Sequence, residues 1–173
     1  YLRNMNIIKQ AVSVFIFLFS VSCDLNQDYF SNSVDDDLEK ALINEIIDSW
    51  HLAASKADSA TYFSIIANDN SIFQGTDDSE RWTKTEFKNW SREYFKRKSA
   101  WTFVPQKGRN INIKNNVAWF DEKLDSKHMG RTRGNGVMIK EGETWKIEHY
   151  TLSLPIPNEL INGVIDTIKN SDY

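Results

Sequence analysis

Residues 117–154 read VAWFDEKLDSKHMGRTRGNGVMIKEGETWKIEHYTLSL, and the pattern in this stretch decides the fold class. Apolar and polar residues alternate along most of it, which is typical of β-strands that bury one face. Glu141-Gly142 inside the stretch and Asn115-Asn116 just before it are hairpin turn signals. Because short turns join antiparallel neighbours, the sequence predicts an antiparallel meander. Its strands are expected at Trp101–Pro105, Asn110–Lys114, Val117–Leu124, Arg131–Ile139 and Thr144–Leu154.

Helical spacing replaces this alternation ahead of the meander. Apolar residues recur every three or four positions across residues 36–56, which predicts a long amphipathic helix. Thr83 and Glu86 form a capping box for a later helix, which is expected to run to the basic residues 96–98. Helices that are segregated from an antiparallel sheet define an α+β fold. The four expected helices begin near Asp36, Asp58, Thr83 and Asn158.

The composition restricts the classes of protein to which the chain can belong. The 173 residues suit one domain, and 40% hydrophobic with 26% charged residues excludes a disordered chain and a polytopic membrane protein. A formal net charge of −3 argues against nucleic-acid binding, which needs a basic face. One cysteine excludes an internal disulfide, and no two of the three histidines have the spacing of metal ligands. We therefore expect neither a metal nor a cofactor.

The N-terminal residues have the pattern of a bacterial lipoprotein signal peptide. Arg3 and Lys9 are the only charged residues before Cys23, and the apolar run Ala11–Val21 is too short to span a membrane. We expect residues 1–22 to be removed, Cys23 to carry the lipid that anchors the protein in the cell envelope, and residues 23–35 to form a flexible tether. The alternatives are an uncleaved anchor, or an ordinary signal peptide with an incidental cysteine, which predicts a secreted or periplasmic protein.

Several short segments of the remaining chain resemble one family. They are Ile72–Asp77, Arg81–Lys84, Val117–Phe120, and Trp145–Tyr150 with Leu152-Ser153. With the order of helices and strands, they make residues 36–159 similar to the SnoaL-like branch of the nuclear transport factor 2-like superfamily. The resemblance implies a curved antiparallel sheet and three helices that form a cone-shaped pocket, followed by a C-terminal helix or tail at residues 160–173. Because this superfamily includes isomerases, cyclases, dehydratases and non-enzymatic binders, the fold does not imply one chemistry.

Two strands supply the candidate catalytic residues of this cone. Asp121 shares a strand face with Trp119, and His149 shares one with Trp145. A carboxylate inside an apolar cone has a raised pKa, which suits Asp121 as a general base, and His149 is the second acid–base candidate. The alternatives are a surface Asp121 that pairs with an arginine, and a core His149 that is bonded to the backbone.

The sheet register decides which of these side chains meet. A two-residue turn at Glu141-Gly142 places Trp119 and Trp145 on opposite faces, whereas a one-residue bulge places them together, and both registers stay open. Gly134-Asn135-Gly136 lies within a strand and predicts a bulge or bend. His51 is expected to face solvent. The expected pocket residues are Trp50, Tyr62, Trp82, Trp90, Trp119, Arg133 and Trp145.

Three hypotheses of function follow from these residues. The leading one is an envelope lipoprotein whose SnoaL-like cone binds a small, partly apolar molecule, with Arg133 available to hold a carboxylate or to form a surface salt bridge. The alternative is a cofactor-independent isomerase, cyclase or lyase that uses Asp121 or His149 for proton transfer. The third is an interaction module with a vestigial pocket, which forms a homodimer through the sheet as the resemblance implies.

Overall fold

The computed structural model describes residues 35–171. The expected signal peptide, the lipid-attachment residue Cys23 and nearly all of the expected tether lie outside the described residues. The chain divides into two compact units, residues 1–41 and 42–173. Residues 35–41 of the first unit are helical, and the helix continues to residue 55 in the second. No helix in the described part of the chain is long and apolar enough to cross a membrane.

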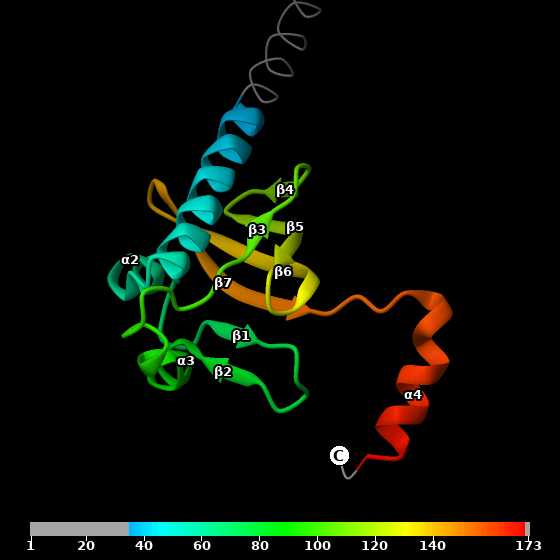
Figure 1. The fold of residues 1–173 in the computed structure, drawn as a ribbon. Coiled ribbons are helices and arrows are strands. Elements are labelled where there is room, and N and C mark those ends of the chain that lie inside the picture. The colour runs from blue at the N-terminus through cyan, green and yellow to red at the C-terminus, as the bar shows by residue number, and fades with distance from the viewer. Residues whose placement is uncertain (1–34, 172–173) are drawn as a thin grey trace, which may run out of the picture. The chain divides into compact units, whose positions relative to one another are not determined.

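A seven-stranded curved sheet forms the main layer of the second unit (Figure 1). The strand order is β2-β1-β7-β6-β5-β3, and β4 also pairs with β5. Neighbouring strands are antiparallel as expected, except that β1 and β7 run parallel. The strands are β1 (Ile72–Gln74), β2 (Arg81–Thr83), β3 (Val104–Pro105), β4 (Asn110–Lys114), β5 (Val117–Ser126), β6 (Gly130–Glu141) and β7 (Thr144–Ser153).

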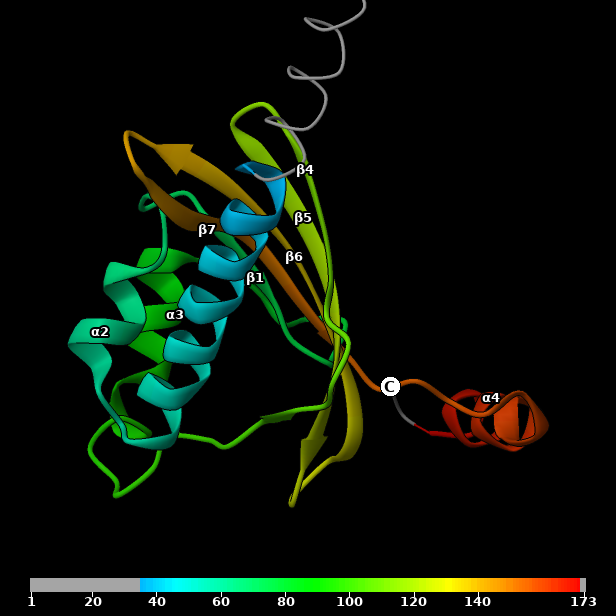
Figure 2. The same ribbon diagram turned by 90° about the horizontal axis from the view of Figure 1, so that it is seen from above.

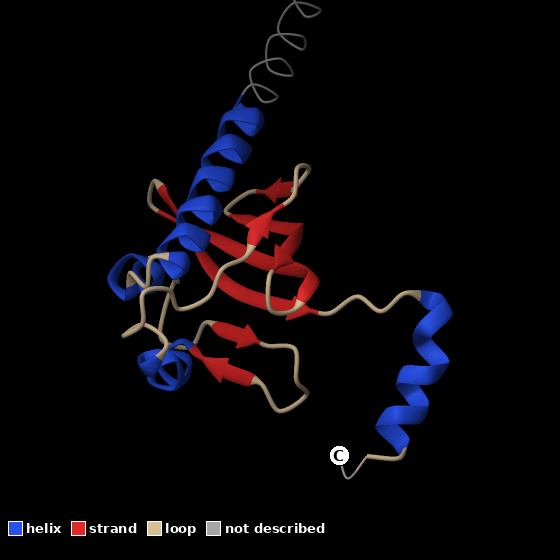
Figure 3. Cartoon of the chain, viewed as in Figure 1, coloured by secondary structure: helices blue, strands red, loops and turns tan. Residues whose placement is uncertain are grey.

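Three helical segments lie on one face of this sheet: residues 42–55, α2 and α3 (Figures 2 and 3). The predicted capping box between Thr83 and Glu86 is present at the start of α3. However, α3 ends at Trp90 instead of continuing to residue 98, and a 3-10 helix follows it. The expected C-terminal helix is also confirmed. The bounds are α2 (Ser59–Ser64), α3 (Lys84–Trp90), the 3-10 helices Ser91–Glu93 and Asn158–Leu160, and α4 (Ile161–Lys169).

The core between the helices and the sheet is rich in aromatic rings. Trp50 of the N-terminal helix stacks on Tyr62 of α2, with 4.9 Å between the ring centroids. Phe73 of β1 stacks on Phe87 of α3 at the same separation. Trp145 of β7 is 1% exposed. Large rings bury much apolar area per residue, and this burial stabilises the contact of the helices with the sheet.

A one-residue bulge in β7 decides which of its side chains point into this core. Met138 of β6 pairs with Ile147, but the preceding β6 residue pairs with His149, which leaves Glu148 as the extra residue. Ile147 is buried before the bulge and Tyr150 is buried after it. Because side chains alternate between the faces of a strand, the extra residue moves His149 to the outer face.

The bulge does not bring Trp119 and Trp145 together. The turn that joins β6 to β7 is Gly142-Glu143, one residue later than expected, because Glu141 still pairs with Thr144. Trp145 lies on the inner face close to this turn, before the bulge begins. Trp119 lies on the outer face of β5 and is 45% exposed. The two tryptophans therefore lie on opposite faces, as the direct two-residue turn predicts.

Candidate functional site

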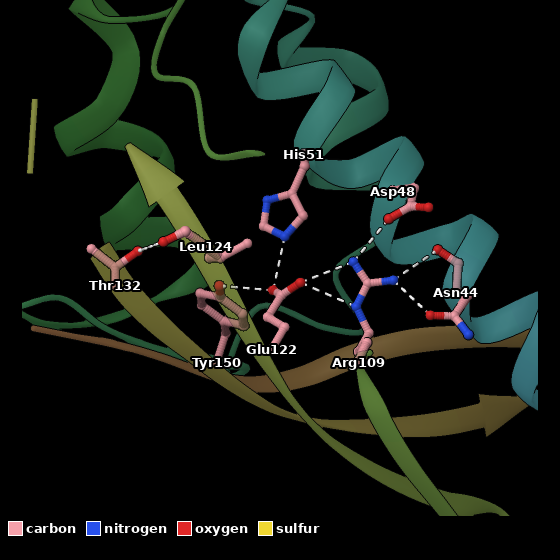
Figure 4. A network of polar contacts seen from close by, with 8 residues as sticks. All are labelled: Asn44, Asp48, His51, Arg109, Glu122, Leu124, Thr132 and Tyr150. Atoms are coloured by element: carbon pink, nitrogen blue, oxygen red, sulfur yellow. Dashed lines mark hydrogen bonds and ion pairs between the residues drawn. The ribbon is translucent and has the colours of Figure 1, made fainter. Parts of the chain in front are cut away.

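Glu122 is the centre of a polar network inside the domain (Figure 4). It lies on the inner face of β5 and is 1% exposed. Its Oε1 accepts hydrogen bonds from His51 Nε2 at 2.8 Å and from the Tyr150 hydroxyl at 3.1 Å. Its Oε2 accepts from Arg109 Nε at 3.1 Å and from Arg109 Nη2 at 2.9 Å. Four hydrogen bonds therefore satisfy the buried carboxylate.

Separate elements bring these donors to the carboxylate. His51 comes from the N-terminal helix, Arg109 directly precedes β4, and Tyr150 comes from β7 beyond the bulge. The Arg109 side chain is 5% exposed and also donates to Asn44 Oδ1 and Asp48 Oδ1, each at 2.8 Å. One buried guanidinium thus joins the N-terminal helix to the sheet through charge-assisted hydrogen bonds.

Two glycines of β6 leave the space that this interior needs. A Cβ atom on Gly134 would clash with the Tyr150 hydroxyl and lie 2.9 Å from Glu122 Oε1. A Cβ atom on Gly136 would clash with the ring of Phe120. The segment Gly134-Asn135-Gly136 is therefore explained by close packing on the inner face, and the bulge is in the adjacent strand.

Burial and charge have opposite effects on the pKa of Glu122. Burial alone raises this pKa, but the hydrogen bond and charge of His51, with the charge of Arg109, outweigh it and hold the pKa below its ordinary 4.5. The pKa of Tyr150 lies well above its ordinary 10.0, because of burial first and the adjacent Glu122 charge second. At neutral pH, Glu122 is therefore an ionised acceptor and Tyr150 is a neutral donor.

Trp50 adds an unsatisfied donor to the same interior. Its side chain is 2% exposed, and its indole Nε1 has no hydrogen-bond partner within the described part of the chain. The indole ring contacts Tyr62, Tyr150 edge-on at 4.7 Å between centroids, and the His51 ring at 5.1 Å. An unpaired buried donor costs about 1–3 kcal/mol, and buried donors in native proteins almost always have an acceptor.

The expected pocket residues are divided between the two faces of the sheet. Trp50, Tyr62 and Trp145 are buried in the core between the helices and the sheet. Trp82 and Trp90 contact each other with their rings tilted by 31° and 4.8 Å between the centroids, and Trp90 is 43% exposed. The remaining four candidates lie on the outer face of the sheet: Trp119, Asp121, Arg133 and His149.

The expectation that Asp121 and His149 line the inside of the cone is therefore wrong. Asp121 is exposed and accepts a hydrogen bond from Asn110 Nδ2 at 2.9 Å. His149 Nε2 and Thr151 Oγ1 share a hydrogen bond of 3.1 Å. Asp121 faces outward because its strand neighbour Glu122 faces inward, and His149 faces outward because of the bulge.

Glu122, His51 and Arg109 were not recognised from the sequence. His51 was expected to be exposed and is 6% exposed. A signal for Glu122 was present, because it is the one carboxylate on the otherwise apolar face of β5. Arg109 has no local signal, since its partners lie 13 to 65 positions away. Among residues 35–171, no three His, Cys, Asp or Glu side chains are grouped to hold a metal ion.

Solved structures of the nuclear transport factor 2-like (NTF2-like) superfamily share this fold of a curved sheet with an N-terminal helix. An NTF2-like protein of unknown function from Pseudomonas putida KT2440 has a TM-score of 0.58 at 14% identity, covering 71% of this chain and 91% of that chain. An NTF2-like protein from Cytophaga hutchinsonii has a TM-score of 0.55 at 15% identity, covering 67% and 98%.

A proposed dehydratase of the NTF2-like family from Streptomyces avermitilis has a TM-score of 0.59 at 11% identity, covering 70% of this chain and 99% of that chain. At such identities, these likenesses establish the fold alone. The SnoaL-like domain family matches residues 43–157, and the chain belongs to that family. A search of curated protein sequences finds no match.

Proposed function

We propose that this SnoaL-like domain binds a small, partly apolar molecule that carries a hydrogen-bond acceptor. The observation that carries the proposal is the buried indole Nε1 of Trp50, which has no acceptor among residues 35–171. Its neighbours Tyr62 and Tyr150 are aromatic, and Tyr150 also belongs to the network around Glu122. A carbonyl or ether oxygen of the ligand would accept from Trp50 while the apolar part contacts the rings.

A comparison of Trp50→Phe with Trp119→Phe tests this proposal. Small cyclic ketones and lactones are screened by thermal shift, since a binder raises the melting temperature by mass action. The Trp50 variant should bind a hit about 2- to 12-fold more weakly, because one net hydrogen bond contributes about 0.5–1.5 kcal/mol. Trp119→Phe makes the same chemical change on the outer face and should bind normally. A wild-type protein that no compound stabilises, or equal binding by both variants, contradicts the proposal.

A proton-transfer enzyme is the second candidate function, and the His51–Glu122 pair favours it. Glu122 accepts a hydrogen bond from His51 Nε2 at 2.8 Å, and Nδ1 is the other ring nitrogen. A carboxylate that holds one ring nitrogen orients the imidazole, and the other nitrogen can then take a proton from a bound molecule. This pair replaces Asp121 and His149 as the proton-transfer candidates.

Deuterium exchange tests the enzyme hypothesis directly. A ketone that stabilises the protein is incubated in deuterated water, and exchange of the hydrogen next to its carbonyl is followed by NMR. Wild-type protein should accelerate the exchange, and His51→Gln should abolish the acceleration. His128→Gln, in the exposed turn between β5 and β6, is the control and should exchange normally. Equal exchange by the two variants would show that His51 is not the base.

Attachment to the bacterial cell envelope through a lipid on Cys23 is also part of the proposal. The sequence alone supports it: the apolar run Ala11–Val21 lies just before this single cysteine. Mass spectrometry of protein that is expressed in bacteria with its leader should find a lipidated Cys23 and no residues 1–22. A chain that keeps the leader, or lacks the lipid, contradicts the anchor.

The outer face of the sheet supports a homodimer. Trp119 and Val117 are 45% and 41% exposed, and their β6 partners Val137 and Ile139 lie beside them on the same face. Contiguous exposed apolar side chains mark interaction surfaces. Light scattering should give the mass of a dimer for wild-type protein and of a monomer for Trp119→Glu. A wild-type monomer contradicts this arrangement.

A further inference from the structure

A second feature of the domain lies at the end of the sheet where β5 stops and β6 begins. A cavity of about 250 Å³ is present there. Its walls come from β5, from β6 and from the segments that follow β3 and β7. The lining residues are Gln106, Lys123, Leu124, Arg131, Thr132, Arg133 and Pro155.

The cavity has three positive charges and no negative charge in its lining. Lys123 of β5 and Arg133 of β6 are directly opposite each other in the strand pairing, and Arg131 follows on the same face. Like charges that are directly opposite destabilise a sheet. The directly opposed Lys123 and Arg133 therefore favour an anion beside them.

One acidic side chain lies beside this group. Asp125 is the cross-strand partner of Arg131, and its Oδ2 accepts a hydrogen bond from Gln106 Nε2 at 2.9 Å, so one carboxylate faces three cationic side chains. None of the salt bridges among residues 35–171 includes Lys123, Arg131 or Arg133. The surface salt bridge that the sequence suggested for Arg133 is thus not formed there.

We propose that this cavity binds a small anion that carries a phosphate group. Guanidinium groups match the oxygens of a phosphate bidentately, and a lysine ammonium adds a point charge. Arg131 and Arg133 would supply the planar donors, Lys123 the third charge, and Thr132 and Gln106 line the same cavity. The lining does not include Trp50, Tyr62 or Tyr150, and the proposal does not depend on the function proposed for the interior.

Calorimetric titration of the whole domain with inorganic phosphate and with glycerol 3-phosphate tests the site at low ionic strength. The double variant Arg131→Gln/Arg133→Gln should bind at least about tenfold more weakly, because each charge-assisted hydrogen bond contributes about 1.5–3 kcal/mol. The control Arg81→Gln/Arg97→Gln removes the same charge from exposed arginines elsewhere and should keep the affinity. Backbone amide shifts on titration should be largest at residues 123–124 and 131–133.

Vesicles that contain phosphatidylglycerol distinguish the two sources of a phosphate group. Binding of the soluble phosphates that is stronger than binding of vesicles assigns the site to a free metabolite. The reverse order assigns it to a lipid headgroup, and both results support a phosphate site. The proposal is overturned if neither source binds wild-type protein, if both double variants weaken binding equally, or if the amide shifts occur elsewhere.

Discussion

The removal of the Glu122 carboxylate is the perturbation that most directly tests the buried network. Glu122→Ala leaves Arg109 and His51 in the interior without their acceptor. The Arg109 side chain is 5% exposed and the His51 side chain is 6% exposed. The remaining carboxylate on Arg109 is that of Asp48, whose side chain is 62% exposed. An exposed partner is screened by water and compensates little for a lost buried one.

The expected loss is about 3–5 kcal/mol in the free energy of unfolding, which is the usual cost of breaking a buried ion pair from one side. The whole free energy of unfolding of a domain of this size is about 5–15 kcal/mol, so the variant is close to the limit at which it still folds. The same loss of free energy should lower the melting temperature by roughly 10–20 °C. The joint replacement Arg109→Leu/Glu122→Leu should lose less than Glu122→Ala, because it leaves no buried guanidinium without its carboxylate partner.

Urea unfolding at pH 7, followed by tryptophan fluorescence, measures these differences. The control is Asp121→Ala, one position away on the outer face, where the loss should be at most about 0.5 kcal/mol. If Glu122→Ala and Asp121→Ala agree within about 1 kcal/mol, the carboxylate is not buried and paired as described, and the argument is refuted.

Three further predictions concern the same interior. The pKa of Glu122 in the folded protein is below its ordinary 4.5, so its ionised form stabilises the fold. This stabilisation is complete above pH 4.5 and is lost as the pH falls through the folded pKa. The free energy of unfolding of the wild type should therefore fall more steeply in acid than that of Glu122→Gln. Tyr150→Phe should cost about 1 kcal/mol in urea unfolding, from one lost hydrogen bond. Gly134→Ala should lower the melting temperature through its clash with Tyr150, whereas Gly163→Ala, which meets open space, should not.

The order of helices and strands was predictable because its signals are local. The apolar spacing of residues 36–56, the Thr83–Glu86 capping box and the Asn115-Asn116 turn each depend on residues that are a few positions apart. The end of α3 was predicted less well. Basic residues favour a helix end but do not prevent an earlier one, and the chain turns after Trp90 so that Phe95 packs on Tyr62 and Trp101.

The candidate site was predicted poorly because its members are far apart in the sequence. Glu122 joins partners that are 13, 28 and 71 positions away. On β5, the alternation separates the two faces correctly, but a polar strand face beside Trp119 predicts Asp121 as the site carboxylate, whereas the buried carboxylate is Glu122 on the apolar face. On β7, no residue type around Glu148 distinguishes a bulged strand from a regular one.

The amino-acid sequence by itself determined the α+β class, the resemblance to the SnoaL-like family and the amphipathic faces of the main elements, because periodicity, caps and turns act over short stretches of chain. Only the tertiary structure decided which face of each strand is buried. One extra residue at Glu148 reverses the alternation, so that Tyr150 reaches Glu122 and His149 does not. The physical reason is that a strand repeats every two residues, so a shift of one changes the face of every side chain beyond it.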